Sequence, residues 1–157
     1  MRAVNFALLL VAMIALLAGG SACRGQADDV SSLVATARNG QSVKVRQEAC
    51  IQLAEAAGDV ASEALIGFLA DDELWYCAAH GLGKRKDPRA VEPLLEHLDP
   101  RSPHTHKFVW ALGEIGDPSA LPAVQELRDR IDATTEEGRR IARELDEAVS
   151  KLRDASS

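Results

Sequence analysis

The chain carries the sequence LGKRKDPRAVEPLL at residues 82–95 and a related sequence, LGEIGDPSALPAVQ, at residues 112–125. The two begin 30 residues apart, and a fixed period of this length is typical of proteins built from stacked helical repeats. The same aliphatic spacing occurs 29 residues earlier, where Leu53 stands in the position of Leu82. The sequence therefore predicts three helix pairs that pack side by side.

An Asp-Pro pair marks the corner between the two helices of a repeat. Asp87 and Asp117 can accept hydrogen bonds from backbone amides as N-caps, and the proline after each suits the first position of a helix. The second helix of each pair is therefore expected to begin at a fixed place. Gly116 suits the left-handed conformation that ends the preceding helix, whereas Lys86 stands there one repeat earlier. That earlier corner is expected to be strained or differently shaped.

The predicted fold is an all-α solenoid of about three helix pairs, in a single domain over residues 29–153. The repeats are expected to span about residues 42–70, 72–99 and 103–131, after an N-terminal half repeat. A helix over residues 134–153 has one apolar stripe and one charged face. Because an array of repeats must cover its last core surface, we expect this helix to be a C-terminal cap.

Residues 82–95 and 110–118 resemble HEAT-like repeats of the phycobilisome-lyase type, and the resemblance extends over roughly residues 42–130. It implies a right-handed α–α superhelix with the first helices on the convex side and the second helices lining the concave side. Most proteins with this repeat bind other proteins, and the lyases that gave it its name attach or remove bilin pigments. The resemblance therefore implies a protein-binding scaffold. A pigment or cofactor lyase, or an accessory subunit of one, is the alternative, and a structural spacer is a third.

Residues 1–22 have the features of an export signal. Arg2 supplies a positive charge, residues 3–18 are apolar apart from one asparagine, and small residues precede Cys23. The apolar run is shorter than the roughly twenty residues that cross a bilayer, which disfavours an uncleaved transmembrane helix. Small residues directly before a cysteine resemble the lipobox of bacterial lipoproteins. An ordinary secretory signal with a free cysteine nearby is the alternative.

The lipobox resemblance implies that the signal is cut before Cys23. Acyl chains such as palmitate on this residue would then anchor the protein to a membrane, with residues 23–28 as a tether. Arg24 follows in place of the aspartate that often retains lipoproteins in the inner membrane. The expected location is the bacterial cell envelope, at the outer membrane and facing the periplasm.

The charge balance excludes some classes of partner. The chain has 18 basic and 24 acidic residues and a net charge of −6. Nucleic acids and anionic lipid headgroups attract a basic surface, so neither is expected as the main partner. We expect a monomer that binds a protein partner, whose identity the sequence does not name.

The sequence contains no pattern typical of a catalytic or metal site. His104 and His106 are two residues apart, which would point them to opposite sides of a helix, and His80 and His97 do not pair with them. The acidic residues at 136–137 stand where a helix begins, and the helix dipole favours negative charge there. We therefore expect no catalytic residue, no metal and no cofactor.

Two cysteines lie in the expected repeats, in a compartment that permits disulfides. The repeat alignment places Cys50 and Cys77 about 200° apart around equivalent neighbouring helices, so the thiols either face each other or face apart. The favoured interpretation is that each replaces an alanine in a tight helix contact. The alternative is a disulfide that closes a loop and stabilises the fold by roughly 3 kcal/mol.

Several polar residues of the second helices lie off the apolar stripe, and Glu96 corresponds to Glu126 one repeat later. The candidate partner-binding residues on this expected concave wall are Arg89, Glu92, Glu96, His97 and Glu126. We hypothesise that the wall binds a protein partner, since repeat proteins use such extended surfaces. The alternatives are a solvated face without a partner and a convex site at Trp75, Tyr76 and Trp110.

Overall fold

The computed structural model describes residues 29–155, and over this range every regular element is a helix. The elements are a helical segment at residues 29–39, α2 (Val43–Glu55), α3 (Asp59–Gly67), α4 (Trp75–Arg85), η1 (Pro88–Ala90), α5 (Val91–Glu96), α6 (Thr105–Ile115), η2 (Pro118–Ala120), α7 (Leu121–Arg130) and α8 (Glu136–Asp154). The predicted all-α solenoid is confirmed. None of the described helices has the length and apolar character needed to cross a bilayer. The expected export signal, the tether and Cys23 lie outside the described residues.

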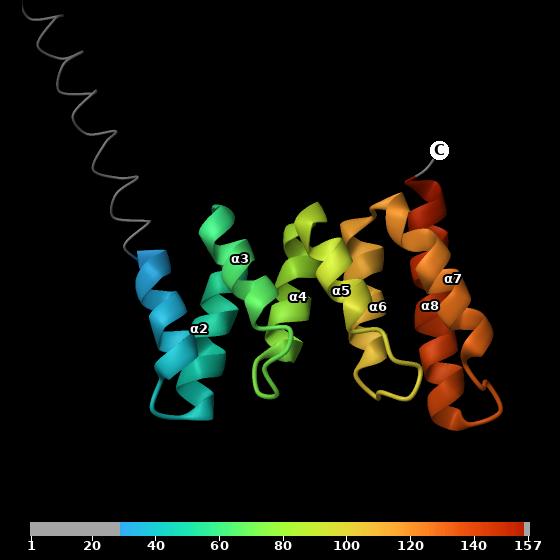
Figure 1. Cartoon of the computed structure of the whole chain (residues 1–157), viewed down its shortest axis with the longest axis horizontal. Coiled ribbons are helices and arrows are strands. Elements are labelled where there is room, and N and C mark those ends of the chain that lie inside the picture. The colour runs from blue at the N-terminus through green and yellow to red at the C-terminus, as the bar shows by residue number, and fades with distance from the viewer. Residues whose placement is uncertain (1–28, 156–157) are drawn as a thin grey trace, which may run out of the picture.

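The helix pairs stand side by side in a row, in the order in which they occur in the sequence, and α8 closes the end of the row beside α6 and α7 (Figure 1). α2, α4, α6 and α8 pack on one another in succession, and we call them the first-helix layer. α3, α5 and α7, the second helices, pack mainly against this layer. Because contacts join mostly neighbouring elements, the fold grows in one direction, as in other solenoids.

Small residues let the helices of the first-helix layer approach closely. The facing pairs are Ala54 with Gly81, Gly83 with Ala111, and Gly113 with Ala148. A Cβ atom built on Gly81 would lie only 2.6 Å from the Cβ of Ala54, closer than real side chains come. Ala148 on α8 therefore occupies the same position in the helix contact as Gly81 on α4 and Ala111 on α6. α8 occupies the place that the first helix of a fourth repeat would take.

The hydrophobic core repeats with the helices. Its largest fully buried aliphatic side chains include Leu53, Leu82 and Leu112 in the first-helix layer, Leu65, Leu94 and Val124 in the second helices, and Leu145 and Leu152 in α8. Successive members of the first two sets lie 29 or 30 residues apart. Since each helix pair buries its apolar stripe against the next one, the core is continuous along the array.

The corners form as the Asp-Pro pairs predict, except that a short 3-10 turn precedes the α-helix at each of them. The Asp87 carboxylate accepts a hydrogen bond from the Arg89 amide, and Asp117 does the same for Ser119. Lys86 adopts the left-handed conformation, with φ 53°, much as Gly116 does with φ 75°. The Lys86 corner thus keeps the shape of the glycine corner, and this conformation costs a non-glycine residue on the order of 1 kcal/mol.

A disulfide joins Cys50 on α2 to Cys77 on α4. The two Cα atoms are 6.3 Å apart, within the usual range for such a bond. The favoured interpretation, in which each cysteine only replaces an alanine in a helix contact, is therefore wrong, and the structure contains the alternative in which the two thiols face each other and are bridged. The bond crosses the same contact between α2 and α4 that Ala54 and Gly81 form.

Candidate functional site

The second helices carry four exposed glutamates, which we call the second-helix wall. They are Glu63 on α3, Glu92 and Glu96 on α5, and Glu126 on α7. Within residues 29–155, neither Glu92 nor Glu96 forms an ion pair, whereas Glu126 lies 3.9 Å from Arg130 in an exposed pair. Exposed pairs of this kind contribute less than about 1 kcal/mol, so the wall keeps most of its negative charge available to a partner.

Arg89 is bound within the chain. Its guanidinium lies 2.8 Å from the Asp87 carboxylate, 2.9 Å from Asp59 and 3.9 Å from Glu63. These contacts join the corner of the second repeat to the start of α3 in the first. The sequence placed Arg89 among the partner-binding residues, but in the structure its charge is already compensated.

His97 was expected on the exposed concave wall, but in the structure it packs against a neighbouring helix. Its ring stacks on Phe108 of α6, with 5.5 Å between the ring centroids and 28° between the planes. The residue is half-buried at the C-terminal end of α5. Its contacts therefore join α5 to α6, and the wall is best described by its glutamates.

The pKa of the Asp87 carboxyl is held well below its usual range, mainly because the Arg89 side chain donates hydrogen bonds to it. A carboxylate whose pKa is lowered by folding stabilises the fold above its unfolded pKa of about 3.9, and this contribution is lost as the pH falls. The pKa of Asp117 is lowered too, in this case by the amide of Ser119. Asp117 has no arginine at the position of Arg89.

Asp87→Asn is therefore expected to lower the free energy of unfolding by about 1 kcal/mol at pH 7, because asparagine cannot keep the ion pair with Arg89. The difference from the wild type should shrink as the pH is lowered below about 4, where the Asp87 carboxyl begins to lose its charge in the unfolded chain. Asp117→Asn, a cap without an arginine, is the matched control and should cost less. Urea unfolding at several pH values checks this, and equal losses in both variants would contradict it.

The opposite side of the array, on the first-helix layer, gathers aromatic and basic side chains. Tyr76 and His80 lie one turn apart on α4, and Lys107 and Trp110 lie one turn apart on α6. Their rings and the Lys107 ammonium are in contact across the two helices. Lys84, one further turn along α4, is exposed beside them. We call these five residues the aromatic–basic patch.

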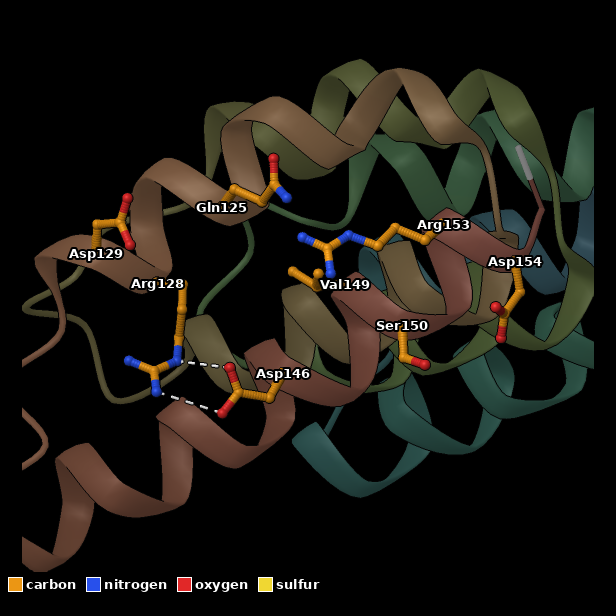
Figure 2. A pocket seen from close by; sticks show the side chains of 8 residues that line it. All are labelled: Gln125, Arg128, Asp129, Asp146, Val149, Ser150, Arg153 and Asp154. Atoms are coloured by element: carbon orange, nitrogen blue, oxygen red, sulfur yellow. Dashed lines mark hydrogen bonds and ion pairs between the residues drawn. The ribbon is translucent and has the colours of Figure 1, made fainter. Parts of the chain in front are cut away.

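Two open clefts contain arginines that are already bound. In a cleft of about 650 Å³ between the first two repeats, Arg85 donates to Ser62 Oγ at 2.9 Å, to the Gly58 carbonyl at 2.7 Å and to the Ala56 carbonyl. Figure 2 shows the other cleft, of about 530 Å³, between α7 and α8. There Arg128 donates to Asp146 at 2.7 Å. Both arginines thus connect helices.

Histidine, cysteine and carboxylate side chains do not gather into a metal-binding group within residues 29–155. No set of three or more of them in this range could hold a metal ion. The His104 ring lies 4.1 Å from Trp75 and the His80 ring lies 4.9 Å from Trp110, so these two histidines contact aromatic rings, as His97 does.

The sequence matches the family described as HEAT repeats in two overlapping stretches, residues 30–105 and 76–145. Together these stretches cover more than half of the chain. The chain belongs to the HEAT-repeat family. Among curated proteins, none is significantly similar to it.

The HEAT-repeat array also resembles a solved structure, that of human deoxyhypusine hydroxylase in complex with glycerol. The two share 23% identity with a TM-score of 0.70, and the match covers 86% of this chain. The chain spans about half of the hydroxylase, since the match covers 47% of that chain. At this identity the likeness concerns the fold.

The sequence predicts only part of the aromatic–basic patch of this HEAT-repeat protein. It indicates an alternative convex site at Trp75, Tyr76 and Trp110, but does not connect these residues with the other members of the patch, which are His80, Lys84 and Lys107. A signal was present, because Tyr76, His80 and Lys84 follow one another at helical spacing. The contact with Lys107 depends on how α4 and α6 pack, which the sequence alone does not give.

Proposed function

We propose that this HEAT-repeat protein is a non-catalytic scaffold that binds a protein partner at the bacterial cell envelope. The observation that supports this best is the second-helix wall, in which the carboxylates of Glu92 and Glu96 are exposed without an ion-pair partner in the described chain. Glu126 continues the row on α7. Repeat proteins bind partners along extended surfaces of this kind.

The charge of the wall indicates the chemistry of the partner. A surface with several glutamates attracts a partner that presents lysines or arginines, and such complementarity speeds association and selects against acidic partners. Arg89 does not neutralise Glu92 or Glu96, because its contacts are with Asp59, Asp87 and Glu63. We therefore expect a basic patch on the partner protein.

The proposal includes lipid attachment at Cys23, which would hold the array close to a membrane. The tether of residues 23–28 contains six residues and can extend at most about 20 Å. Acylation of a cysteine with more than one chain gives stable anchoring, whereas a single chain gives only marginal binding. The array would then present its wall to partners within the envelope.

Capture from crosslinked cell envelopes tests both parts. The wild type is expected to fractionate with membranes and to retain a specific crosslinked protein. Glu92→Lys combined with Glu96→Lys should remain in the membrane fraction and lose that protein, because two of the four glutamates of the wall are then replaced by positive charges.

Cys23→Ser is the second variant in the same experiment. It should leave the membrane fraction and no longer incorporate labelled fatty acid, while purified protein should still bind the captured partner. If the Glu92→Lys, Glu96→Lys variant still captured the partner, the partner would not bind at the second-helix wall. Fatty-acid label on Cys23→Ser would rule out the anchor.

A further inference from the structure

Both tryptophans and the single tyrosine of the chain lie at the contact between α4 and α6. Only 4% of the residues are aromatic, and Trp75, Tyr76 and Trp110 stand within this one region. Trp and Tyr are enriched among the residues that supply most of the energy in protein interfaces. Their concentration on one surface of an otherwise aliphatic protein therefore points to a binding role.

The rings contact one another. The His80 ring is nearly parallel to that of Tyr76, with centroids 6.5 Å apart and planes 12° apart, and to that of Trp110, at 4.9 Å and 20°. The Lys107 ammonium lies 3.9 Å from the centre of the Trp110 ring and 4.9 Å from that of Tyr76. Contacts of a cation with two aromatic faces are attractive and restrict all three side chains. The patch is therefore organised before any partner arrives.

The backbone supports this arrangement. A Cβ atom on Gly83 would lie 2.9 Å from the Trp110 ring, so glycine provides the space in which the indole packs. Burial, with the nearby charges of Lys107 and Lys84, lowers the pKa of His80. Its imidazole is therefore neutral at pH 7, and the positive charge of the patch comes from the two lysines.

Part of the patch is exposed. Tyr76 is 53% exposed. In the described part of the chain no carboxylate forms an ion pair with Lys84 or Lys107. A protein with net charge −6 thus presents two ammonium groups without a carboxylate partner beside the exposed Tyr76 ring.

We propose that the aromatic–basic patch is a second docking surface, for a protein segment in which an apolar side chain is flanked by carboxylates. The apolar side chain would contact the exposed Tyr76 ring, and the carboxylates would pair with Lys84 and Lys107. The patch lies on the first-helix layer, whereas the wall lies on the second helices. The scaffold can therefore bind segments of opposite charge on different helices.

The geometry favours a protein segment over a lipid surface. Aromatic residues that anchor proteins at bilayers insert their rings among the headgroups, whereas Trp110 is half-buried over Gly83 and stacked on His80. The negative net charge of the chain also opposes approach to anionic lipids. A rigid aromatic surface with two lysines instead matches an acidic, partly apolar peptide.

Intrinsic fluorescence tests this directly, because both tryptophans of the chain contribute to the same region. The probe is a synthetic peptide with a central Leu-Phe pair flanked on each side by glutamates. Titration of the purified protein should change the tryptophan emission to saturation, and added salt should weaken the binding. The same peptide with lysines in place of glutamates, or with Ser-Gly in place of Leu-Phe, should bind at least about tenfold more weakly.

Lys84→Glu combined with Lys107→Glu is expected to weaken binding of the acidic peptide about tenfold or more. Lys44→Glu combined with Arg101→Glu makes the same change of charge outside the patch and should bind as the wild type does. Tyr76→Ser, at an exposed position, should weaken binding while leaving the far-ultraviolet circular dichroism spectrum unchanged. Glu92→Lys combined with Glu96→Lys should retain binding, so the test is independent of the wall.

Several outcomes would overturn the proposal. Equal binding of the glutamate and lysine peptides would exclude a carboxylate-specific surface. An emission change with vesicles of anionic phospholipid, but none with the peptide, would make the patch a membrane contact. Concentration-dependent self-association that Lys84→Glu with Lys107→Glu abolishes, without peptide binding by the wild type, would identify a second copy as the occupant.

Discussion

Gly83→Leu is expected to lower the free energy of unfolding by about 3 kcal/mol, because α4 and α6 are too close for a side chain at this position. A Cβ atom on Gly83 would lie 3.0 Å from the Ala111 Cα atom, and backbone cannot move aside as a flexible side chain can. The substitution must therefore push the helices apart and open the core along the array. Urea denaturation followed by circular dichroism measures the loss.

Gly67→Ala is the matched control for this prediction. Gly67 is the last residue of α3, and a Cβ atom built on it would meet nothing within 4 Å. Replacement there should be neutral or should stabilise by about 0.4–1 kcal/mol, because alanine restricts the unfolded chain. If Gly83→Leu unfolded at the same urea concentration as Gly67→Ala, α4 and α6 could not be packed as closely as described, and the prediction would be wrong.

Loss of the disulfide is the second large effect that we expect. Cys50→Ala combined with Cys77→Ala should lower the free energy of unfolding by roughly 3 kcal/mol, because the bond joins residues 27 apart and restricts the unfolded chain. Alanine fits both helix contacts, so the native packing should change little. Chemical denaturation of wild type and variant under oxidising conditions measures the difference.

The same comparison under reducing conditions is the control. The reduced wild type should become about as stable as the double alanine variant, and the variant itself should not respond to the reductant. A count of thiols in denatured, unreduced protein gives an independent reading. Free thiols at both Cys50 and Cys77 would contradict the bond.

The fold was predictable because its determinants are local or periodic. The repeat of Leu82 and Leu112 gives the helix pairs, and the caps at Asp87 and Asp117 depend only on residues within the same corner. The glutamates of the wall could be assigned to the second helices from their spacing alone. Lys86 agrees with the expected strain at its corner, because it adopts the left-handed conformation that Gly116 adopts freely.

The contacts between repeats were harder to predict. Whether Cys50 and Cys77 face each other depends on the rotation of α2 against α4, and the sequence left both orientations open. Arg89 forms an ion pair with Asp59 in the preceding repeat, a contact that the spacing of residues along one helix does not predict. The stacking of His80 on Trp110 likewise requires the distance between α4 and α6. Each of these contacts is set by the geometry between neighbouring helices.

The match between Gly113–Ala148 and Gly83–Ala111 makes the length of this array adjustable. α8 recognises the last repeat through the same small-residue contact that one repeat uses to recognise the next. A further helix pair could therefore be inserted before α8 without a new type of junction at either side. The helix that closes the C-terminal end is thus independent of the number of repeats. The length of the binding surface can change while α8 stays the same.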